Sequence, residues 1–389
     1  MASLNVLFNI QGEGKGHLMQ AVALAEWLRD AGHSVIGAHV GHGKSTSVPS
    51  FLQSRLQCEI TSHASPGLRV NMATREMDLL RTSGDTLRYF SKYVKSVRDL
   101  NTSIEQKKPD VIVNFYEPLI GFVSKKNIPT VAIAHQYMFY HPSYPFTAGN
   151  RFQRWGARSF TDYTARSADK LLALSLYPTF DMPERKLRVV PPLLRQGLFD
   201  LTSEITFPFY YLAYVWRPDL LGEVREWCKE NPRKNVDCFV AGLTPNLAEN
   251  IPSNLRLHPL DDNLFLQLMA GCSGVATTAG FETCAEAYFL DKPLLMVPTH
   301  LEQRCNALDA VSMGGARMST SFKLDQLDSI PCAETQAFKV WAYRAPETFV
   351  TEIEKTAGLQ LARKRFTIMP RSHLYKAPRP SPIEPIQMA

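Results

Sequence analysis

Short apolar runs alternate with longer stretches of helical periodicity along most of the chain. An apolar run at 4–10 is followed by a glycine-rich turn, by apolar residues at helical spacing over 17–31, and by a second apolar run at 34–40. This order predicts a strand, a crossover helix and a parallel strand, which together form a right-handed βαβ unit. The pattern predicts these further elements of a first domain over residues 1–190: strands at 110–115, 130–135 and 170–175, a long helix at about 74–106 and a short helix at 118–126.

A proline pair at 191–192 interrupts this rhythm, because two prolines in succession stop a regular element. We therefore predict a linker at 191–200 and a second domain at 201–334. Its strands are predicted at 208–215, 235–242, 255–260, 274–278 and 293–298, and its helices at 218–230, 263–270, 282–290 and 302–313. A helical pattern at 335–368, interrupted at Pro346, has no strand after it, and a basic tail follows at 369–389. The whole pattern predicts an α/β protein with two Rossmann-like domains.

The composition is that of a globular protein rather than of a disordered, fibrous or membrane-spanning one. Of the 389 residues, 45% are hydrophobic and 21% are charged. No apolar stretch approaches the ~20 residues that span a bilayer. The seven cysteines are scattered and odd in number, which favours reduced thiols. The start of the chain lacks the pattern of a signal peptide, so we expect a cytoplasmic protein.

The net charge of +6 is concentrated at the end of the chain. Residues 361–389 hold six basic residues and one acidic residue, so the rest of the chain is close to neutral. A near-neutral body gives no reason to expect nucleic acid as a partner. We interpret the tail as a solvated terminus, with contact to the anionic inner face of a membrane as the alternative.

A glycine-rich loop, Gly12-Glu-Gly-Lys-Gly-His17, connects the first predicted strand to the first helix. Gly14 and Gly16 permit a phosphate or sugar to approach the backbone closely, and the helix N-terminus supplies N–H groups. A tight turn that needs glycine only for its shape is the alternative. The loop is no dinucleotide fingerprint, because the second strand ends in His39-Val-Gly-His-Gly43 without an acid. It is no P-loop either, because Ala38 stands where that motif needs a glycine.

A second candidate region follows the strand predicted at 274–278. Small residues form a turn there, and the amides of the next helix can hold a diphosphate. Glu286, inside that helix, is predicted to accept hydrogen bonds from a ribose diol, and Glu302 and Gln303 suit the hydroxyls of a hexose. The alternative is an acid that caps the helix and a solvated Glu-Gln pair. The predicted donor contacts of this region are Thr278, Ala279, Gly280, Glu282, Thr283, Glu286, Glu302 and Gln303.

The two regions together resemble the lipid-linked GT-B glycosyltransferases, notably the peptidoglycan N-acetylglucosaminyltransferase group. The resemblance is carried by GEGKGHLMQAVALAEWLRDAGHSV near the start of the chain and by the later positions Gly280, Thr283, Glu286, Val297, Pro298, Gln303, Asn306 and Ala307. It implies two Rossmann-like domains that face each other across a cleft, with a C-terminal helix that crosses back to the first domain. It also implies metal-independent, inverting transfer of a sugar from a nucleotide diphosphate sugar, UDP favoured, to the hydroxyl of a lipid-linked acceptor.

Such a transfer needs a base, and His17 is the predicted one because imidazole titrates near neutral pH. A histidine that only caps its own helix is the alternative. Glu117, just after the strand at 110–115, is predicted to orient His17 or to serve as the base itself. No spacing typical of metal ligands is visible, so neither a metal nor a cofactor is predicted.

The remaining predicted contacts lie at other strand ends. His135 and Gln136 resemble the acceptor loop of the family, although they lack its glutamate and asparagine. Leu243, His258 and Leu260 are predicted to flank the nucleotide base, because they follow neighbouring strands of the second domain.

Two other functions compete with glycosyl transfer: non-hydrolysing epimerisation of a UDP-sugar on the same fold, and nucleotide-sugar binding without catalysis. Incubation with a UDP-sugar and no acceptor separates them. An epimerase makes a new sugar nucleotide, a transferase shows slow hydrolysis, and a binding protein shows no reaction.

The long helix predicted at about 74–106 also has two interpretations. Leu87, Phe90, Val94, Val97 and Ile104 share one helical face beside several basic residues. The stripe is either part of the core or a membrane-surface patch that meets a lipid-linked acceptor.

Overall fold

The computed structural model describes residues 3–13, 15–43, 48–71, 76–124, 127–146, 149–203, 205 and 210–359, and within these ranges it contains two parallel sheets. The first sheet has the strand order β3-β2-β1-β6-β7-β8-β9. Its strands are β1 (Asn5–Gln11), β2 (Ser34–His42), β3 (Ile60–Ala64), β6 (Val111–Phe115), β7 (Thr130–Ala134), β8 (Lys170–Leu174) and β9 (Leu187–Val190). A small antiparallel pair, β4 (Val70–Asn71) and β5 (Glu76–Met77), stands apart from it.

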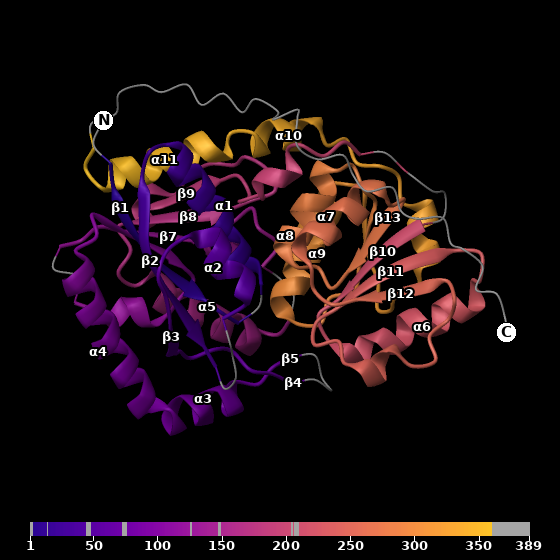
Figure 1. Cartoon of the computed structure of the whole chain (residues 1–389), viewed down its shortest axis with the longest axis horizontal. Helices are drawn as coiled ribbons and strands as arrows, with labels where there is room; N and C mark the ends of the chain where they lie inside the picture. Colours follow the sequence, from indigo (N-terminus) through magenta and orange to yellow (C-terminus); the bar gives the residue numbers. More distant parts are fainter. Residues whose placement is uncertain are drawn as a thin grey trace.

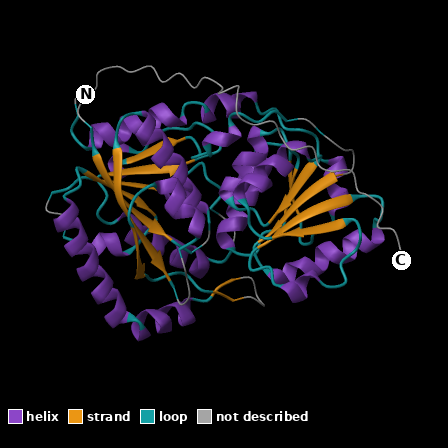
Figure 2. Ribbon diagram, viewed as in Figure 1, coloured by secondary structure: helices purple, strands orange, loops and turns teal. Residues whose placement is uncertain are grey.

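The second sheet has the strand order β12-β11-β10-β13-β14-β15. Its strands are β10 (Tyr210–Val215), β11 (Asn235–Val240), β12 (Leu255–His258), β13 (Gly274–Thr277), β14 (Leu294–Met296) and β15 (Ala316–Met318). The two sheets form two fans of strands with helices between and around them (Figure 2). The prediction of two Rossmann-like halves is therefore confirmed.

Helices connect the strands in both halves. Those of the first half are α1 (Gly16–Asp30), α2 (Ser50–Leu56), α3 (Leu79–Arg88), α4 (Phe90–Lys107) and α5 (Arg151–Ala165). Those of the second half are α6 (Leu221–Glu230), α7 (Asp262–Gly271), α8 (Phe281–Phe289) and α9 (Leu301–Ser312). The helix predicted at 118–126 is instead a short 3₁₀ turn, Leu119–Phe122.

The C-terminal segment returns to the first half, as predicted. It forms α10 (Gln336–Ala342) and α11 (Ala345–Thr356), and α11 contacts α1, β7 and β9 (Figure 1). Pro346 lies in the first turn of α11, where proline is tolerated, so the predicted interruption is a boundary between two helices. Phe349 of α11 packs on Trp27 of α1 with ring centroids 6.0 Å apart, and Glu354 lies 3.0 Å from His33. Residues 360–389, which include the predicted basic tail, lie outside the described part of the chain.

The predicted long helix is divided into α3 and α4, because Tyr89 between them leaves the helical conformation. The division separates the predicted apolar stripe into two parts. Ile104 of α4 is buried and Val97 packs against the core, as the core interpretation requires. Leu87 and Phe90, however, are 81% and 62% exposed, so the interpretation of the whole stripe as core is wrong for these two residues. Of the helices described, none is long and apolar enough to cross a membrane.

Candidate active site

A cavity of about 580 Å³ lies between the two halves, at the carboxyl ends of both sheets. From the first half it is lined by residues that follow β1, β6 and β7, and from the second half by residues at the ends of β10, β11, β12, β13 and β14. This is the position at which open α/β sheets bind ligands. The predicted site residues that line it are Gly16, His17, His135, Gln136, Leu260, Thr278, Gly280, Glu282, Thr283, Glu286, Glu302 and Gln303.

Not every predicted residue reaches the cavity. Glu117, Leu243, His258 and Ala279 are absent from its lining, and Gly14 lies outside the described residues. Ala279 still shapes the site, because its φ of 64° places it in the left-handed turn that precedes α8. His258 stacks on Phe239, which lines the cavity, and pairs with Asp237 at 2.5 Å. Leu243 packs against the core of the second half.

His17 stands in the first turn of α1 and is buried against the ring of Tyr116, with ring centroids 5.4 Å apart. Its Nδ1 lies 3.2 Å from Oε1 of Gln20. Burial lowers the pKa of His17, although the nearby carboxylate of Glu282 acts in the opposite direction. The imidazole is therefore neutral near pH 7, which is the state that can accept a proton.

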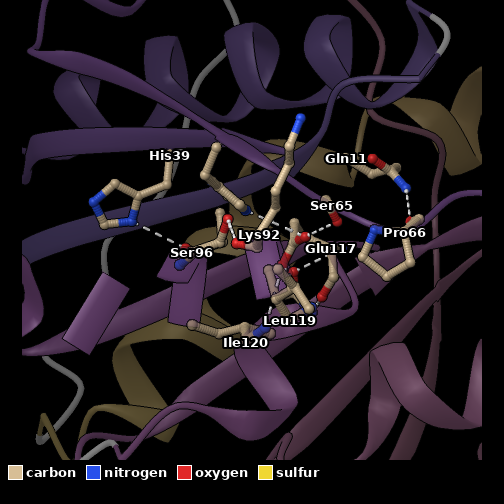
Figure 3. A network of polar contacts seen from close by, with 12 residues as sticks. Gln11, His39, Ser65, Pro66, Lys92, Ser96, Glu117, Leu119 and Ile120 are labelled. Atoms are coloured by element: carbon tan, nitrogen blue, oxygen red, sulfur yellow. Dashed lines mark hydrogen bonds and ion pairs between the residues drawn. The ribbon is translucent and has the colours of Figure 1, made fainter. Parts of the chain in front are cut away.

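Glu117 has a different environment from the predicted one. Its Oε2 accepts hydrogen bonds from the amides of Leu119 at 2.8 Å and Ile120 at 3.2 Å, and its Oε1 accepts one from the hydroxyl of Ser65 (Figure 3). Nε2 of His63 lies 3.3 Å from the same Oε1. The fully buried carboxylate thus holds the turn after β6 in place, and none of the contacts described here joins it to His17.

The two halves approach each other closely at α1 and α8. Gln20 of α1 is fully buried, and its Nε2 donates a hydrogen bond to Oε1 of Glu282 in the first turn of α8. A Cβ atom at Gly16 would lie 2.6 Å from Oε2 of Glu282, so a larger residue at this position would displace the carboxylate of Glu282 from where it lies. The glycine predicted for close approach to a ligand therefore also permits close approach of the second half.

Glu286 lies in α8 with an unpredicted partner, Arg195 from the segment after β9. Nη2 and Nε of Arg195 lie 2.5 and 2.7 Å from Oε1 of Glu286, and Nη1 donates to the carbonyl of Asp262 at 3.0 Å. Both side chains are buried and line the cavity. Burial raises the pKa of Glu286, and Arg195 opposes that effect. The sequence placed Arg195 in the linker, and only the folded chain shows that it faces the donor region.

Three polar residues of the predicted hexose and acceptor contacts, His135, Glu302 and Gln303, line the cavity. His135 stacks on Phe281 with ring centroids 4.8 Å apart, and its Nε2 lies 3.2 Å from Oε1 of Glu302. Burial by itself would raise the pKa of Glu302, but the imidazoles around it, His135 first, lower it to about 2. Gln303 is anchored through its Oε1, which accepts from the amide of Thr299 at 2.9 Å.

The wall of the cavity on the side of the first half is largely apolar. The apolar and aromatic side chains that form it are Met19, Leu68, Val70, Met77, Tyr116, Phe139 and Phe160. A second cavity of about 210 Å³ adjoins it, and Glu13 lines both cavities. Its other lining residues include the ion pair Arg69–Asp85, at 2.8 Å, together with Tyr89 and Tyr93. Burial raises the pKa of Glu13, and Arg69 opposes the shift. The lining of the smaller cavity is thus more polar than the first-half wall of the larger one.

Solved structures share this architecture. The calicheamicin glycosyltransferase CalG4 superimposes with a TM-score of 0.58 at 15% identity, over 92% of this chain and 99% of that chain. MurG of Acinetobacter baumannii does so with a TM-score of 0.53 at 15% identity, over 90% and 99%. Staphylococcus aureus MnaA in complex with UDP gives a TM-score of 0.59 at 14% identity, over 92% and 98%. At these identities the likenesses establish the GT-B fold.

The family of the chain follows from its sequence rather than from these superpositions. No curated protein matches the chain. A sequence model described as Glycosyl transferase family 1, however, matches residues 4–331, which is most of the chain and covers both sheets together with the cavity between them. The protein is therefore a glycosyltransferase and belongs to glycosyl transferase family 1.

Proposed function

We propose that the protein transfers a hexose or N-acetylhexosamine from a UDP-sugar to an acceptor hydroxyl, with inversion at the anomeric carbon. The observation that carries the proposal is that His17 of the first half and residues at the N-terminus of α8 of the second half line one cavity. His17 takes the proton of the acceptor hydroxyl while the acceptor oxygen bonds to the anomeric carbon. The bond from that carbon to the diphosphate breaks, and UDP leaves with the electron pair. Attack from the side opposite the leaving group gives inversion.

The donor half supplies the groups that a leaving diphosphate needs. The backbone amides at the N-terminus of α8, after the turn of Thr278 to Gly280, carry partial positive charge. Lys15 and Arg195 add positive charge to the lining of the same cavity. In this arrangement Glu286 accepts hydrogen bonds from the ribose, and Glu302 and Gln303 bind the transferred sugar.

The first experiment is incubation with a UDP-sugar, first alone and then with a panel of hydroxylated acceptors. Release of UDP that increases with acceptor, together with a new glycoside of inverted configuration, supports the proposal. A new sugar nucleotide formed without acceptor would instead identify an epimerase. Absence of UDP binding by calorimetry, or a product with retained configuration, would contradict it.

Replacement of Glu286 tests the donor site. Glu286→Ala should raise the dissociation constant of UDP about tenfold or more, because a hydrogen bond to a charged group contributes ~1.5–3 kcal/mol. Calorimetry on the purified variant measures the change. Glu249→Ala, an exposed carboxylate of the same half, is the matched control. Equal UDP affinity in the Glu286 variant and the wild type would remove Glu286 from the ribose site.

The acceptor proposed for this site has an apolar part. The apolar wall around Met77, Phe139 and Phe160 lies on the side of the cavity that holds His17, so an acceptor whose hydroxyl reaches His17 packs its body there. The adjoining polar cavity at Glu13 offers room for a hydroxylated part of the same molecule. Lipid-linked acceptors, as the sequence resemblance implies, combine these two features.

Contact with an anionic membrane would bring such an acceptor to the site, and α3 together with the start of α4 is the proposed contact surface. Leu80, Leu87 and Phe90 are 87%, 81% and 62% exposed, beside the exposed basic residues Arg88 and Lys92. Exposed apolar side chains next to basic ones are typical of helices that lie on membrane surfaces.

Flotation with liposomes containing anionic lipid should therefore recover the protein at low salt and lose it at high salt. Replacing Leu80, Leu87 and Phe90 together with serine should abolish recovery. Trp155→Ser, which removes an equally exposed aromatic side chain from α5, should not. If the wild type does not float at any salt concentration, the acceptor reaches the site from solution.

A further inference from the structure

We infer that Gln20 is a positioning residue: held by Glu282 of the opposite half, its side-chain amide fixes the tautomer of His17 that acts as the base. The inference rests on the proposed role of His17. It concerns a residue that contacts neither the proposed donor nor the proposed acceptor, since Gln20 does not line the cavity.

The direction of each hydrogen bond follows from the chemistry of the three groups. A carboxylate only accepts, so the NH₂ of Gln20 must face Glu282, as its Nε2 does. The oxygen of the same amide then faces His17, and Oε1 lies 3.2 Å from Nδ1. An amide oxygen cannot donate, so Nδ1 must carry the proton of the neutral imidazole. Nε2 is left as the basic nitrogen, and the ring lines the cavity.

The chain of contacts crosses from one half of the molecule to the other. His17 and Gln20 are three residues apart on α1, whereas Glu282 is 262 residues further along the chain, in the first turn of α8. The N-terminus of α8 stabilises the charge of Glu282. Gly16 permits the approach, because a Cβ there would lie 2.6 Å from Glu282. The order that Glu282 imposes on the amide is therefore present only while the two halves are in contact.

Through this contact, the tautomer of His17 depends on whether the two halves are in contact. When the halves separate, Gln20 loses Glu282, and its amide turns freely, with either its oxygen or its nitrogen toward His17. The imidazole then divides between its two tautomers, and only one of them has a basic Nε2. A donor that draws the halves together thus restores the competent tautomer before the acceptor reacts.

The test reads the tautomer directly, by NMR of protein with ¹⁵N-labelled histidine in the presence of saturating UDP. His17→Gln identifies the signals of His17 by their loss. In the wild type we expect protonated Nδ1 and unprotonated Nε2 near pH 7. Gln20→Leu, which keeps the size of the side chain but removes the amide, should give a mixture of tautomers. It should also lower kcat several-fold to tenfold, with UDP affinity little changed.

Two further variants keep the inference testable if Gln20→Leu does not fold. Glu282→Leu removes the carboxylate that orients the amide and should also give mixed tautomers. Glu282→Gln should do the same, because an amide can donate as well as accept and so no longer dictates which end of the Gln20 amide faces it. Gln20→Glu places a carboxylate beside His17, so it should raise the pKa of the imidazole and move the acid limb of the activity profile to higher pH.

Gln153→Leu is the matched control, because Gln153 is also buried and bonded, through Nε2 to the carbonyl of Met77 at 3.0 Å. It should lower stability without changing the His17 signals. Unchanged tautomer and pH profile in Gln20→Leu and Glu282→Leu would overturn the inference, as would a wild-type His17 protonated at Nε2. Failure of the proposed function is a separate result, namely no UDP binding and no transfer by the wild type.

Discussion

Replacing His17 with alanine should lower the rate of transfer by ~10²-fold or more, because the acceptor hydroxyl then has no base. Donor binding should stay nearly intact, since the proposed donor contacts Thr278, Gly280 and Glu286 belong to the other half. Single-turnover transfer with a UDP-sugar, compared with UDP affinity by calorimetry, separates the two effects. Most of the activity retained in the variant would show that another residue is the base.

The pH dependence provides a second check on the same residue. A base is active when neutral, so activity is lost as the pH falls through its pKa. Because burial lowers the pKa of His17 below its ordinary 6.5, the acid limb of kcat/KM should lie below that value. His135→Gln is an informative companion, since this imidazole lines the same cavity. If only the His135 variant lost the acid limb, His135 rather than His17 would be the base. Glu117 is a weaker candidate, because its carboxylate accepts hydrogen bonds from the amides of the turn after β6.

Ending the chain after Glu334 should abolish transfer and unfold or strongly destabilise the protein. The deletion removes α10 and α11, whose Phe338, Phe349 and Ile353 are buried in the core. Loss of one large buried aromatic side chain alone costs ~3–5 kcal/mol, which is a large part of the stability of an ordinary protein. Thermal unfolding followed by circular dichroism measures the loss.

A chain that ends at Pro370 is the control, because it keeps every residue that the structure describes. It should unfold at the same temperature as the full chain and retain transfer to a soluble acceptor. If the chain ending at Glu334 stays folded and active, α10 and α11 are needed neither for folding nor for transfer.

The sequence predicted the sheets well where the strands are apolar and β-branched. The runs at 4–10, 110–115 and 130–135 match β1, β6 and β7 within one or two residues. Strands β3, β9 and β15 were missed. The sequences of β3 and β15, Ile-Thr-Ser-His-Ala and Ala-Arg-Met, are short and partly polar, and β9, Leu-Arg-Val-Val, has only four residues. Edge strands bury only part of their surface, so their sequences need not be apolar. The pattern of apolar residues therefore does not identify such strands reliably.

Some residues of the candidate site could likewise be predicted from the sequence, and others could not. Residues placed directly by a strand end or a helix start, such as His17, Thr278 and Glu302, face one cavity as their positions suggested. Glu117 also follows a strand, but the chain turns at once and its carboxylate closes the turn. Gln20 and Arg195 gave no signal in the sequence, because their partners are 262 and 91 residues away. Contacts of that kind become visible only when the halves are assembled.

The returning helix has a consequence for exchanging halves between such enzymes. In a chimaera joined at the linker, everything after the linker comes from the second parent. In this protein that junction would replace α11, whose Phe349 packs on Trp27 and whose Glu352 pairs with Arg188 and lies 3.5 Å from Lys170. All three partners belong to the first parent. A workable chimaera therefore needs two crossovers, one in the linker and one near Glu334, so that the last helix is inherited together with the half that it covers.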